Sequence, residues 1–501
     1  MNIARAFAVL LLLSILIGVL TMGNAVEPRP GAPDRRQFQK MFEDGNYKEA
    51  LEGFRKLALD PKDDPRQVGQ DLQMAVQCLQ QLNRVDEVDA LIESAIEVHK
   101  QNWRLLWAAA CQYMELPHHG FMIAGKFHRG DQRGGGEVVN ANERDRVRAL
   151  QLMVQALPPA KQDANHAEVG EFLLGLANML LNNRDFEESW RLQYLTDLGQ
   201  LPDYEEGWGS WREIPGAPVD ENGKPVYHQV PKSFETAQTD GQRWRWALEQ
   251  AVEFNPQQAD EVKLHFADFL WNQFDVQTMA DYGWAFGRMA TDDTKQDESG
   301  TYALHTLGEN ETIARLTTGI KRFELPDEFN FIKLYQQVAD KPQSGWRIRA
   351  LGQLAEIFEN RRQYPRAAEF WRRLVEMAPE DDGHKHRLQQ IVGNWGRFEP
   401  VMGQPASDKA TVEYRFRNGK SVQFTAHAIK AQLLLDDVKA YVKSRPQELD
   451  WDMLNLENIG YRIVEQNQQK YLGEQVAAWK LDLEPREKHF DKRVTVETPL
   501  T

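Results

Sequence analysis

The stretch ENRRQYPRAAEFWRRLVEMAPED, residues 359–381, decides the fold of most of this chain. Apolar residues recur in it at steps of three and four, and a proline follows them: Tyr364, Ala367, Trp371, Leu374 and Pro379. This spacing places the apolar side chains on one face of a helix, which the proline ends. A small alanine lets a neighbouring helix approach closely, and residues 350–359 supply an amphipathic helix just before. The stretch therefore predicts two helices packed against each other.

A related pattern occurs near the start of the chain, in DGNYKEALEGFRKLALDPKD at residues 44–63. Its corresponding positions are Tyr47, Ala50, Phe54, Leu57 and Pro61, with the proline one residue closer than in the downstream copy. Weaker copies lie at residues 82–99 and 182–195. All four resemble the second helix of a tetratricopeptide repeat, a helix–turn–helix unit that stacks into a solenoid. The resemblance implies a mainly α fold, an irregular tetratricopeptide-like helical solenoid over residues 33–400.

Two long irregular stretches interrupt this pattern, near residues 115–145 and 203–240. The first is rich in glycine and basic residues, and the second carries prolines and an Asn222-Gly223 turn signal. Each is expected to form a long loop or a small hairpin. Loops of this length are often functional or face a partner.

A different pattern begins near residue 410, where apolar residues alternate with polar ones. The alternating apolar positions are Val412, Tyr414, Phe416, Val422 and Phe424. Asn418-Gly419 stands between the two runs, which is the strongest short signal for a tight β-hairpin. Residues 410–475 are therefore predicted to form a β-hairpin followed by helices.

The last residues, 476–501, alternate again, at Trp479, Leu481 and Leu483 and then at Val494 and Val496. Two strands alone cannot bury a core or satisfy their edges in water. This segment is therefore predicted to hold the first strands of an incomplete β-domain, with unpaired backbone around Leu481 and Val494. The whole C-terminal part would be a small α+β segment.

The amino terminus has the composition of an export signal. Arg5 lies in a short basic head, an uncharged apolar run extends from residue 6 to residue 22, and small residues follow up to Ala25. We expect residues 1–25 to be a signal peptide cleaved after Ala25. The run is also long enough to serve as a membrane anchor. Either reading places the rest of the chain outside the cytoplasm, in the periplasm or the extracellular space.

The composition argues against a nucleic-acid-binding role and against a disulfide scaffold. A net charge of −15 argues against binding nucleic acid. The only two cysteines, Cys78 and Cys111, are too few for a disulfide scaffold and are expected to be small buried residues.

Three short motifs could indicate a reactive group or a metal site. Cys78 and Gln81 have the spacing of an internal thioester, but they lie among apolar residues of helical spacing and are expected to belong to a core. His118-His119 and His384-x-His386 lack further metal ligands and are expected to be exposed. We predict no catalytic residue, no cofactor and no metal site, and hence no enzyme.

Three longer stretches carry a family resemblance: residues 298–340, 414–429 and 449–500. They resemble the amino-terminal region of bacterial alpha-2-macroglobulin-like proteins. In that family a signal and a helical region lead into macroglobulin β-sandwiches, a bait segment and a thioester domain, which together trap proteases. The chain ends at Thr501, where such relatives continue. The resemblance implies an amino-terminal piece or a truncated gene product, with a truncated macroglobulin-like β-domain, an incomplete β-sandwich, at residues 476–501.

The function expected from this resemblance is an exported, non-enzymatic scaffold of a protease-inhibitor trap that lacks the bait and thioester parts. Its partners would be later domains of the full-length protein, or proteases reached through them. The membrane would be involved only through an uncleaved leader. The alternative is a free-standing tetratricopeptide-like envelope adaptor that recruits other proteins.

The chain holds 14 tryptophans, and large aromatic side chains suit both helical cores and binding grooves. Two roles stay open for Trp103, Trp107, Trp244, Trp246 and Trp371. They would either fill the core of the repeats or contact a partner on the concave face of the solenoid.

Overall fold

The structure is a computed structural model. It describes residues 35–500 except 132–133, 183, 185–187, 209–215, 280–302, 400–409, 446–447, 449, 455–458 and 465–466. The expected leader at residues 1–25 and its cleavage site Ala25 lie outside the described residues. The described part is mainly helical, with a few small antiparallel sheets.

The chain folds as two compact units, and each unit is made of three segments that are separate in the sequence. The first unit comprises residues 1–182, 192–212 and 229–255, and the second comprises 183–191, 213–228 and 256–501. The irregular stretch near 203–240 is thus divided between them.

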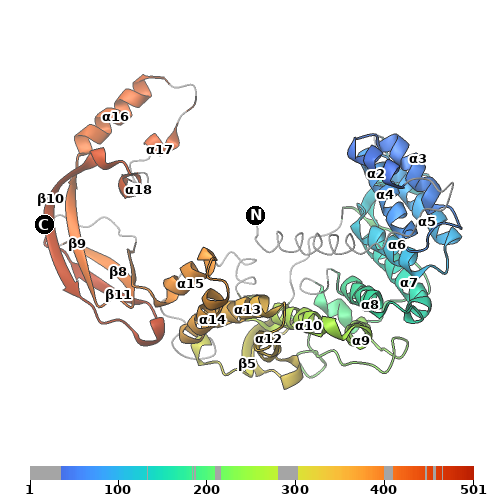
Figure 1. Cartoon of the computed structure of the whole chain (residues 1–501). Helices are drawn as coiled ribbons and strands as arrows, with labels where there is room; N and C mark the ends of the chain where they lie inside the picture. Colours follow the sequence, from blue (N-terminus) through green and yellow to red (C-terminus); the bar gives the residue numbers. More distant parts are fainter. Residues whose placement is uncertain are drawn as a thin grey trace. The chain divides into compact units, whose positions relative to one another are not determined.

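The first unit is built on helices that pack mainly against their neighbours in sequence (Figure 1). They are α2 (Arg35–Glu43), α3 (Tyr47–Ala58), α4 (Val68–Gln81), α5 (Val88–Val98), α6 (Trp103–Glu115), α7 (Asn142–Lys161), α8 (His166–Leu181) and α9 (Asp240–Phe254).

Helix α3 shows how the repeat spacing becomes packing. Ala50, Phe54 and Leu57 are buried on one face, while Tyr47 begins the helix. Gly53 leaves room for the ring of Phe38 on α2, because a Cβ at that glycine would overlap the ring. The helix ends at Ala58, and Pro61 follows in the next turn. The apolar spacing therefore fixes which face of α3 meets α2 and α4.

Helices α6 and α8 lie side by side and run in the same direction. Arg104, in the first turn of α6, donates from Nη2 to Glu168 Oε2 in the first turn of α8 at 2.5 Å. The Trp103 and Phe172 rings are 5.6 Å apart. One turn further along α6, Trp107 Nε1 would lie 3.0 Å from a Cβ added at Gly175. The alternate helices α6 and α8 are therefore parallel neighbours, with α7 packed against both.

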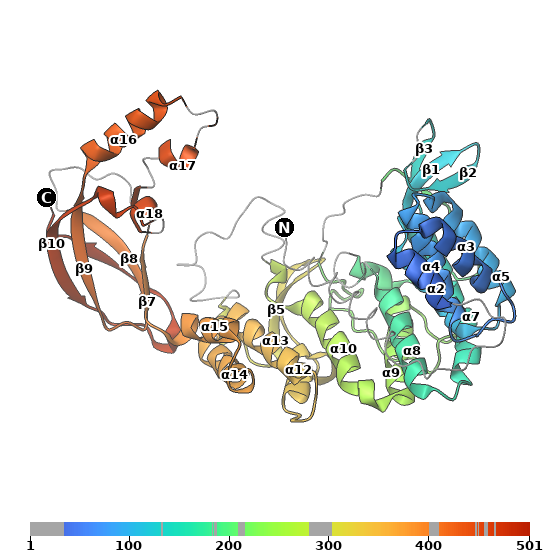
Figure 2. The ribbon, with the colours of Figure 1, turned by 45° about the horizontal axis from the view of Figure 1, so that its top comes forward.

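A four-stranded sheet forms in the stretch near 115–145, where the sequence predicted a long loop or a small hairpin (Figure 2). Its order is β2-β1-β3-β4, and its strands are β1 (His119–Ile123), β2 (Lys126–Arg129), β3 (Glu137–Asn140) and β4 (Glu205–Glu206). Ala124 and Gly125 both take positive φ, at 50° and 75°, which suits the tight turn between β1 and β2. Strand β4 comes from the second irregular stretch, so the two interruptions of the helical pattern pair with each other.

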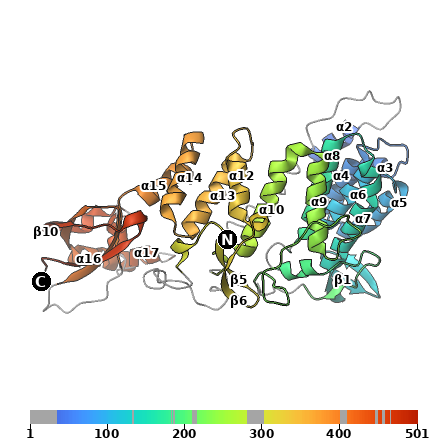
Figure 3. The ribbon, with the colours of Figure 1, turned by 90° about the horizontal axis from the view of Figure 1, so that it is seen from below.

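The helical part of the second unit contains α10 (Ala259–Phe274), α12 (Phe331–Ala339), α13 (Arg347–Asn360), α14 (Tyr364–Met377) and α15 (Asp382–Val392) (Figure 3). A hairpin of β5 (Glu311–Leu316) and β6 (Gly319–Glu324) precedes α12.

Helix α10 runs parallel to α13 in this unit. Arg349 Nη2, near the start of α13, is 2.5 Å from Asp268 Oδ2 on α10. Asn360 at the end of α13 donates to Asp275 just after α10 at 3.4 Å. Helix α12 packs against both. The alternation of the first unit therefore recurs here.

The stretch at 359–381 forms the end of α13 and the whole of α14. Ala367, Trp371 and Leu374 of α14 are buried, and α14 packs against α13. Helix α14 ends at Met377, two residues before Pro379. Trp371 also donates its indole N–H to Glu359 at the end of α13 at 2.5 Å. Trp371 thus links α14 to the end of α13.

Two sheets form the end of the second unit. Their strands are β7 (Trp395–Phe398), β8 (Thr411–Arg417), β9 (Ser421–Ile429), β10 (Leu472–Asp482) and β11 (Lys492–Glu497). One sheet has the order β11-β8-β7 and the other pairs β10 with β9. Between β9 and β10 the chain forms α16 (Ala431–Lys443), α17 (Trp451–Leu454) and α18 (Ile459–Val464).

The predicted hairpin at Asn418-Gly419 is wrong, because β8 and β9 belong to different sheets. Asn418 takes a φ of 59°, but its side-chain amide donates to the carbonyls of Ile391 and Gly393 at 2.9 and 2.8 Å. These bonds hold the corner against the end of α15. The chain therefore turns out of one sheet and into the other instead of pairing with itself.

The two sheets pack face to face through aromatic side chains. Phe424 of β9 lies 5.3 Å from Tyr414 of β8 and 5.2 Å from Trp479 of β10, measured between ring centroids. Leu481 of β10 is paired with Val422, and Val494 of β11 with Tyr414. The expectation of unpaired backbone therefore holds for at most one side of each strand. Within the described residues β10 and β11 are edge strands with one partner each.

Replacing Phe424 with alanine tests the packing between the two sheets. The ring is buried between both sheets, so its loss should lower the free energy of unfolding of this part by about 3–5 kcal/mol. Urea unfolding followed by tryptophan fluorescence measures the change. His427→Ala, an exposed position on the same strand, is the control and should change it by less than about 0.5 kcal/mol. Equal effects of the two substitutions would refute the packing.

Candidate functional site

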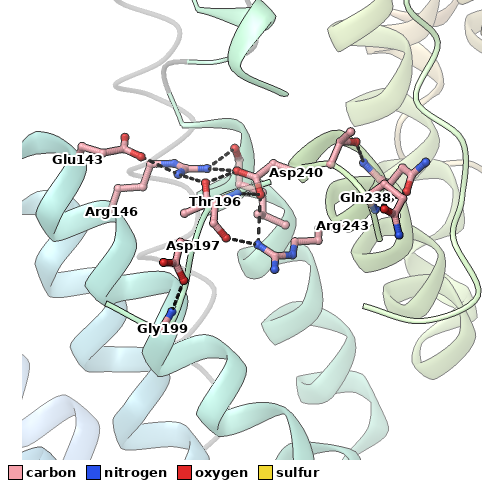
Figure 4. Close-up of polar contacts among 11 residues, drawn as sticks. Glu143, Arg146, Thr196, Asp197, Gly199, Gln238, Asp240 and Arg243 are labelled. Carbon is pink, nitrogen blue, oxygen red and sulfur yellow. Dashed lines mark hydrogen bonds and ion pairs between the residues drawn. The ribbon is translucent and has the colours of Figure 1, made fainter. Parts of the chain in front are cut away.

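A buried network of charged and polar groups lies around Asp240, in the first turn of α9 (Figure 4). The Asp240 side chain is fully buried. Its carboxylate accepts from Thr196 N at 3.0 Å, from Arg146 Nη2 at 3.2 Å and from Arg243 Nη1 at 3.3 Å, and also from the Thr196 hydroxyl. One carboxylate therefore meets two guanidinium groups and the backbone of a loop.

Arg146 extends this network to helices α7 and α8. It projects from α7, is buried, and donates from Nη2 to the carbonyl of Leu180 near the end of α8 at 3.2 Å. Its Nη1 reaches Thr196 Oγ1 at 3.2 Å and Glu143 at 3.3 Å. A carbonyl at the end of a helix lacks a partner within the helix, and a cation near it is favourable.

The network fixes the backbone of residues 194–199, which we call the anchored loop. The Asp240 N–H donates to Tyr194 O at 2.7 Å, and Arg243 Nη1 donates to Thr196 O at 2.9 Å. From α7, Gln151 donates to Leu198 O at 3.1 Å. These bonds reach the loop from two helices.

The side chains at the start of the anchored loop are exposed to solvent. Tyr194 is 63% exposed and Leu195 is 46% exposed. Tyrosine is among the residues that most often dominate protein interfaces. A backbone that is already fixed reduces the entropy lost on binding. The anchored loop is therefore our candidate site, a preorganised contact for another polypeptide.

A second network holds the sheet against the helices of the first unit. Arg129 of β2 is buried and donates to Asp145 on α7 at 2.7 and 2.9 Å, and to Asp89 on α5 at 2.8 Å. His118 Nδ1 is also 2.8 Å from Asp145. Trp208 follows β4 of the same sheet by two residues, is 63% exposed, and lies 5.4 Å from the His119 ring.

The expectation that both histidine pairs are exposed is therefore partly wrong. His118 and His119 are half-buried, and His119 Nε2 is 3.4 Å from Asp131. His384 is half-buried beside Trp371, while His386 is exposed. Burial arises because each half-buried histidine packs against a partner that sequence spacing does not identify.

A third polar cluster joins the helices of the second unit. Asp268 of α10 accepts from the Tyr335 hydroxyl of α12 at 2.6 Å and from Arg349 of α13. Burial raises the pKa of Asp268 above its usual range, although Arg349 and Tyr335 act in the opposite direction. Burial, with the nearby Arg349 charge, lowers the pKa of His265 to about 4. The cluster holds three helices together.

Cys78 and Cys111 are both free thiols, the first buried and the second half-buried. Burial raises the pKa of Cys78 to about 11 and that of Cys111 to about 12. Both thiols are therefore protonated at neutral pH, and a protonated thiol is a poor nucleophile. Cys78 and Gln81 both lie inside α4, without the tight turn that a thioester needs.

The structure decides between the two roles left open for most of the tryptophans. Trp103, Trp244, Trp246 and Trp371 are buried, and Trp107 is half-buried. The four buried side chains fill cores, so the alternative of partner contact is wrong for them. Sequence reasoning missed the exposed Trp208, which lies in an irregular stretch, and the exposed Tyr194. Tyr194 lies in the weak repeat copy at residues 182–195, whose described residues form the 3-10 helix Ser189–Gln193 instead of the expected α-helix.

Metal and membrane sites were also sought in the described part of the chain. No group of three or more histidine, cysteine, aspartate or glutamate side chains there is placed to hold a metal ion. None of the described helices combines the length and the apolar composition needed to cross a bilayer.

Comparisons with known proteins give little guidance. No protein-family model matches the chain, and no curated protein matches it. Among solved structures it is similar to one described as Assembly Chaperone of RpL4 (Acl4), residues 1–338, with a TM-score of 0.24 and 9% sequence identity. That match covers 71% of this chain and 93% of the other. A TM-score this low carries no argument about fold or function.

Replacing Asp240 with alanine tests whether the network fixes the anchored loop. The substitution leaves two guanidinium groups buried without their carboxylate, so stability should fall by about 3–5 kcal/mol. Hydrogen exchange at Thr196 N, which donates to this carboxylate, should become faster. Asp197→Ala, an exposed aspartate of the same loop, should cost about 1 kcal/mol or less. Unchanged exchange in the Asp240 variant would contradict the role given to the network.

The pH dependence of stability tests the lowered pKa of the half-buried His265. Its folded pKa of about 4 lies below the unfolded value of 6.5, so the unfolded state binds more protons between these values. Stability should therefore fall as the pH drops from 6.5 to 4, by up to about 3 kcal/mol from this group. His265→Gln should remove that part of the loss, measured as the difference from wild type in urea titrations. If the two proteins lost stability equally between pH 6.5 and 4, the pKa of His265 would not be lowered in the folded protein.

Proposed function

We propose that this chain is the exported, non-enzymatic scaffold of an alpha-2-macroglobulin-like protease trap, an endopeptidase inhibitor. It would act by binding other polypeptides, either later domains of a full-length protein or proteases reached through them. The observation that carries the binding role is the anchored loop, in which a fixed backbone presents Tyr194 and Leu195 to solvent.

The arrangement of the helices supports the finer description of the fold. Alternate helices run parallel in both units, and small residues lie against aromatic rings where helices meet. A tetratricopeptide-like solenoid has this arrangement. We therefore propose an irregular solenoid for the helical region at residues 33–400. The two-sheet part that follows would be the beginning of a macroglobulin-like β-domain.

The use of the charged residues is consistent with a scaffold. Arg146, Arg129 and Arg349 each pair with an aspartate on a different helix or strand, and so join elements together. Arginine and aspartate side chains of the kind that can act in catalysis here form structural ion pairs between elements. A reactive site needs titratable groups that converge on a cleft. The proposal therefore assigns these clusters to stability rather than catalysis.

Affinity capture from an envelope fraction of the producing cells tests this function. The bait is the purified chain, and the comparison is Tyr194→Ser combined with Leu195→Ser, which removes the exposed apolar surface of the anchored loop. We expect at least a tenfold loss of the captured partner, because truncated hot-spot residues cost about 1–2 kcal/mol or more each. Val98→Ser, another exposed apolar position, is the control and should retain capture.

The identity of the captured partner, read by mass spectrometry, separates the two candidate functions. A macroglobulin-type polypeptide or a protease supports the trap scaffold. Other envelope proteins would support the adaptor instead and contradict the trap. Capture that is equal for the double variant and the wild type would refute the role of the anchored loop.

A further inference from the structure

Strand β7 is an edge strand whose four residues are all exposed. In the part of the second unit that the structure describes, it pairs with β8 alone. An edge strand presents unpaired N–H and C=O groups along its free side, which can pair with another chain. The short strand Trp395–Phe398 therefore offers both backbone groups and side chains.

The outer face of this sheet carries three arginines in one row. Arg397 of β7 lies directly opposite Arg415 of β8, which lies directly opposite Arg493 of β11. Like charges directly opposite each other on neighbouring strands are destabilising. Glu399 is close to all three, with Oε1 at 2.7 Å from Arg415 Nε but at 3.8 Å from both Arg397 and Arg493. One carboxylate oxygen therefore lies within 4 Å of all three guanidinium groups.

The end of the row at β7 is open to solvent. The Arg397 side chain is 55% exposed. The Trp395 ring lies 5.6 Å from the Arg397 guanidinium and 5.7 Å from that of Arg415. The neighbouring Arg417 is already paired with Asp491 at 2.7 Å. Of the three arginines in the row, Arg397 is the most exposed and lies on the edge strand, so an incoming group would meet its charge first.

The inner face of β7 is apolar, and it is exposed to about the same extent as Arg397 on the outer face. Phe398 is 58% exposed, although its ring lies 5.7 Å from Tyr414 and 5.8 Å from Phe424 of the aromatic core. Gly396 has no side chain on this face, and a Cβ there would overlap the Tyr414 hydroxyl. The aromatic core therefore ends at Phe398 with an uncovered edge.

We propose that β7 accepts, as an added strand, an extended peptide segment in which acidic and apolar residues alternate. Side chains of a strand point to opposite faces in turn, so such a segment places carboxylates beside Arg397 and apolar groups beside Phe398. Backbone pairing along β7 gives affinity, and the two faces give specificity. The guanidinium fork matches the two oxygens of a carboxylate.

The two faces together favour a peptide over other anions. A nucleic acid needs basic residues along an extended surface, and the overall negative charge opposes it. An isolated anion would use Arg397 but leave Phe398 uncovered. This site is separate from the anchored loop, so either proposal can fail without the other.

Binding of short synthetic peptides to the full chain tests the proposal. The probe is a fluorescein-labelled Glu-Val-Glu-Val-Glu pentapeptide, about the length of β7, and binding is followed by fluorescence anisotropy. Lys-Val-Lys-Val-Lys and Glu-Ser-Glu-Ser-Glu remove the charge match and the apolar face in turn. We expect each control peptide to bind at least tenfold more weakly. Equal binding of the acidic peptide and either control would overturn the proposal.

Variants of the chain and hydrogen exchange locate the bound peptide. Arg397→Glu reverses an exposed charge and should weaken binding at least tenfold, while Lys480→Glu on the outer face of the other sheet should leave it unchanged. Amide exchange in residues 395–398 should slow when the peptide is bound. Unaltered affinity of the Arg397 variant, or binding without slower exchange in β7, would contradict strand addition.

Discussion

Close approach of neighbouring elements, where one of them lacks a large side chain, is the constraint on which the rest of this structure depends. Gly53 leaves room for Phe38, and Gly175 lies against Trp107. Each ring fills the space left by a missing side chain, so the helices are held in register as well as together. Because this packing holds the helices in register, irregular segments can be inserted between them without displacing them.

Buried ion pairs then fix the positions of the irregular segments. Arg146 and Asp240 are 94 residues apart and meet in one network, which also fixes the backbone at Thr196. Arg129 and Asp145 do the same for the small sheet. A buried ion pair is weak evidence for extra stability, but losing one partner is costly. These pairs therefore specify where a segment lies, which is what a binding scaffold requires.

Local periodicity predicted much of the fold, and long-range contacts explain the rest. Spacings of three and four identified α3 and α14, and alternation identified the strands from β8 to β11. The pairing at Asn418 failed because an Asn-Gly pair suits a hairpin and a corner equally well, and contacts with α15 selected the corner. The anchored loop could not be predicted, because its partners are distant in sequence and the weak repeat copy at residues 182–195 favoured a helix around Tyr194. Burial of the tryptophans was one of two readings, and only packing could decide it.

The central claim is that a fixed backbone presents Tyr194 to another polypeptide. Site-specific photocrosslinking measures this most directly, with p-benzoylphenylalanine placed at position 194 of the full chain in the producing cells. Position 98, where the chain has an exposed valine, serves as the comparison. The account predicts a light-dependent adduct with a second polypeptide from position 194 and none from position 98. Adducts of equal yield from both positions, or none from position 194 in a folded protein, would contradict it.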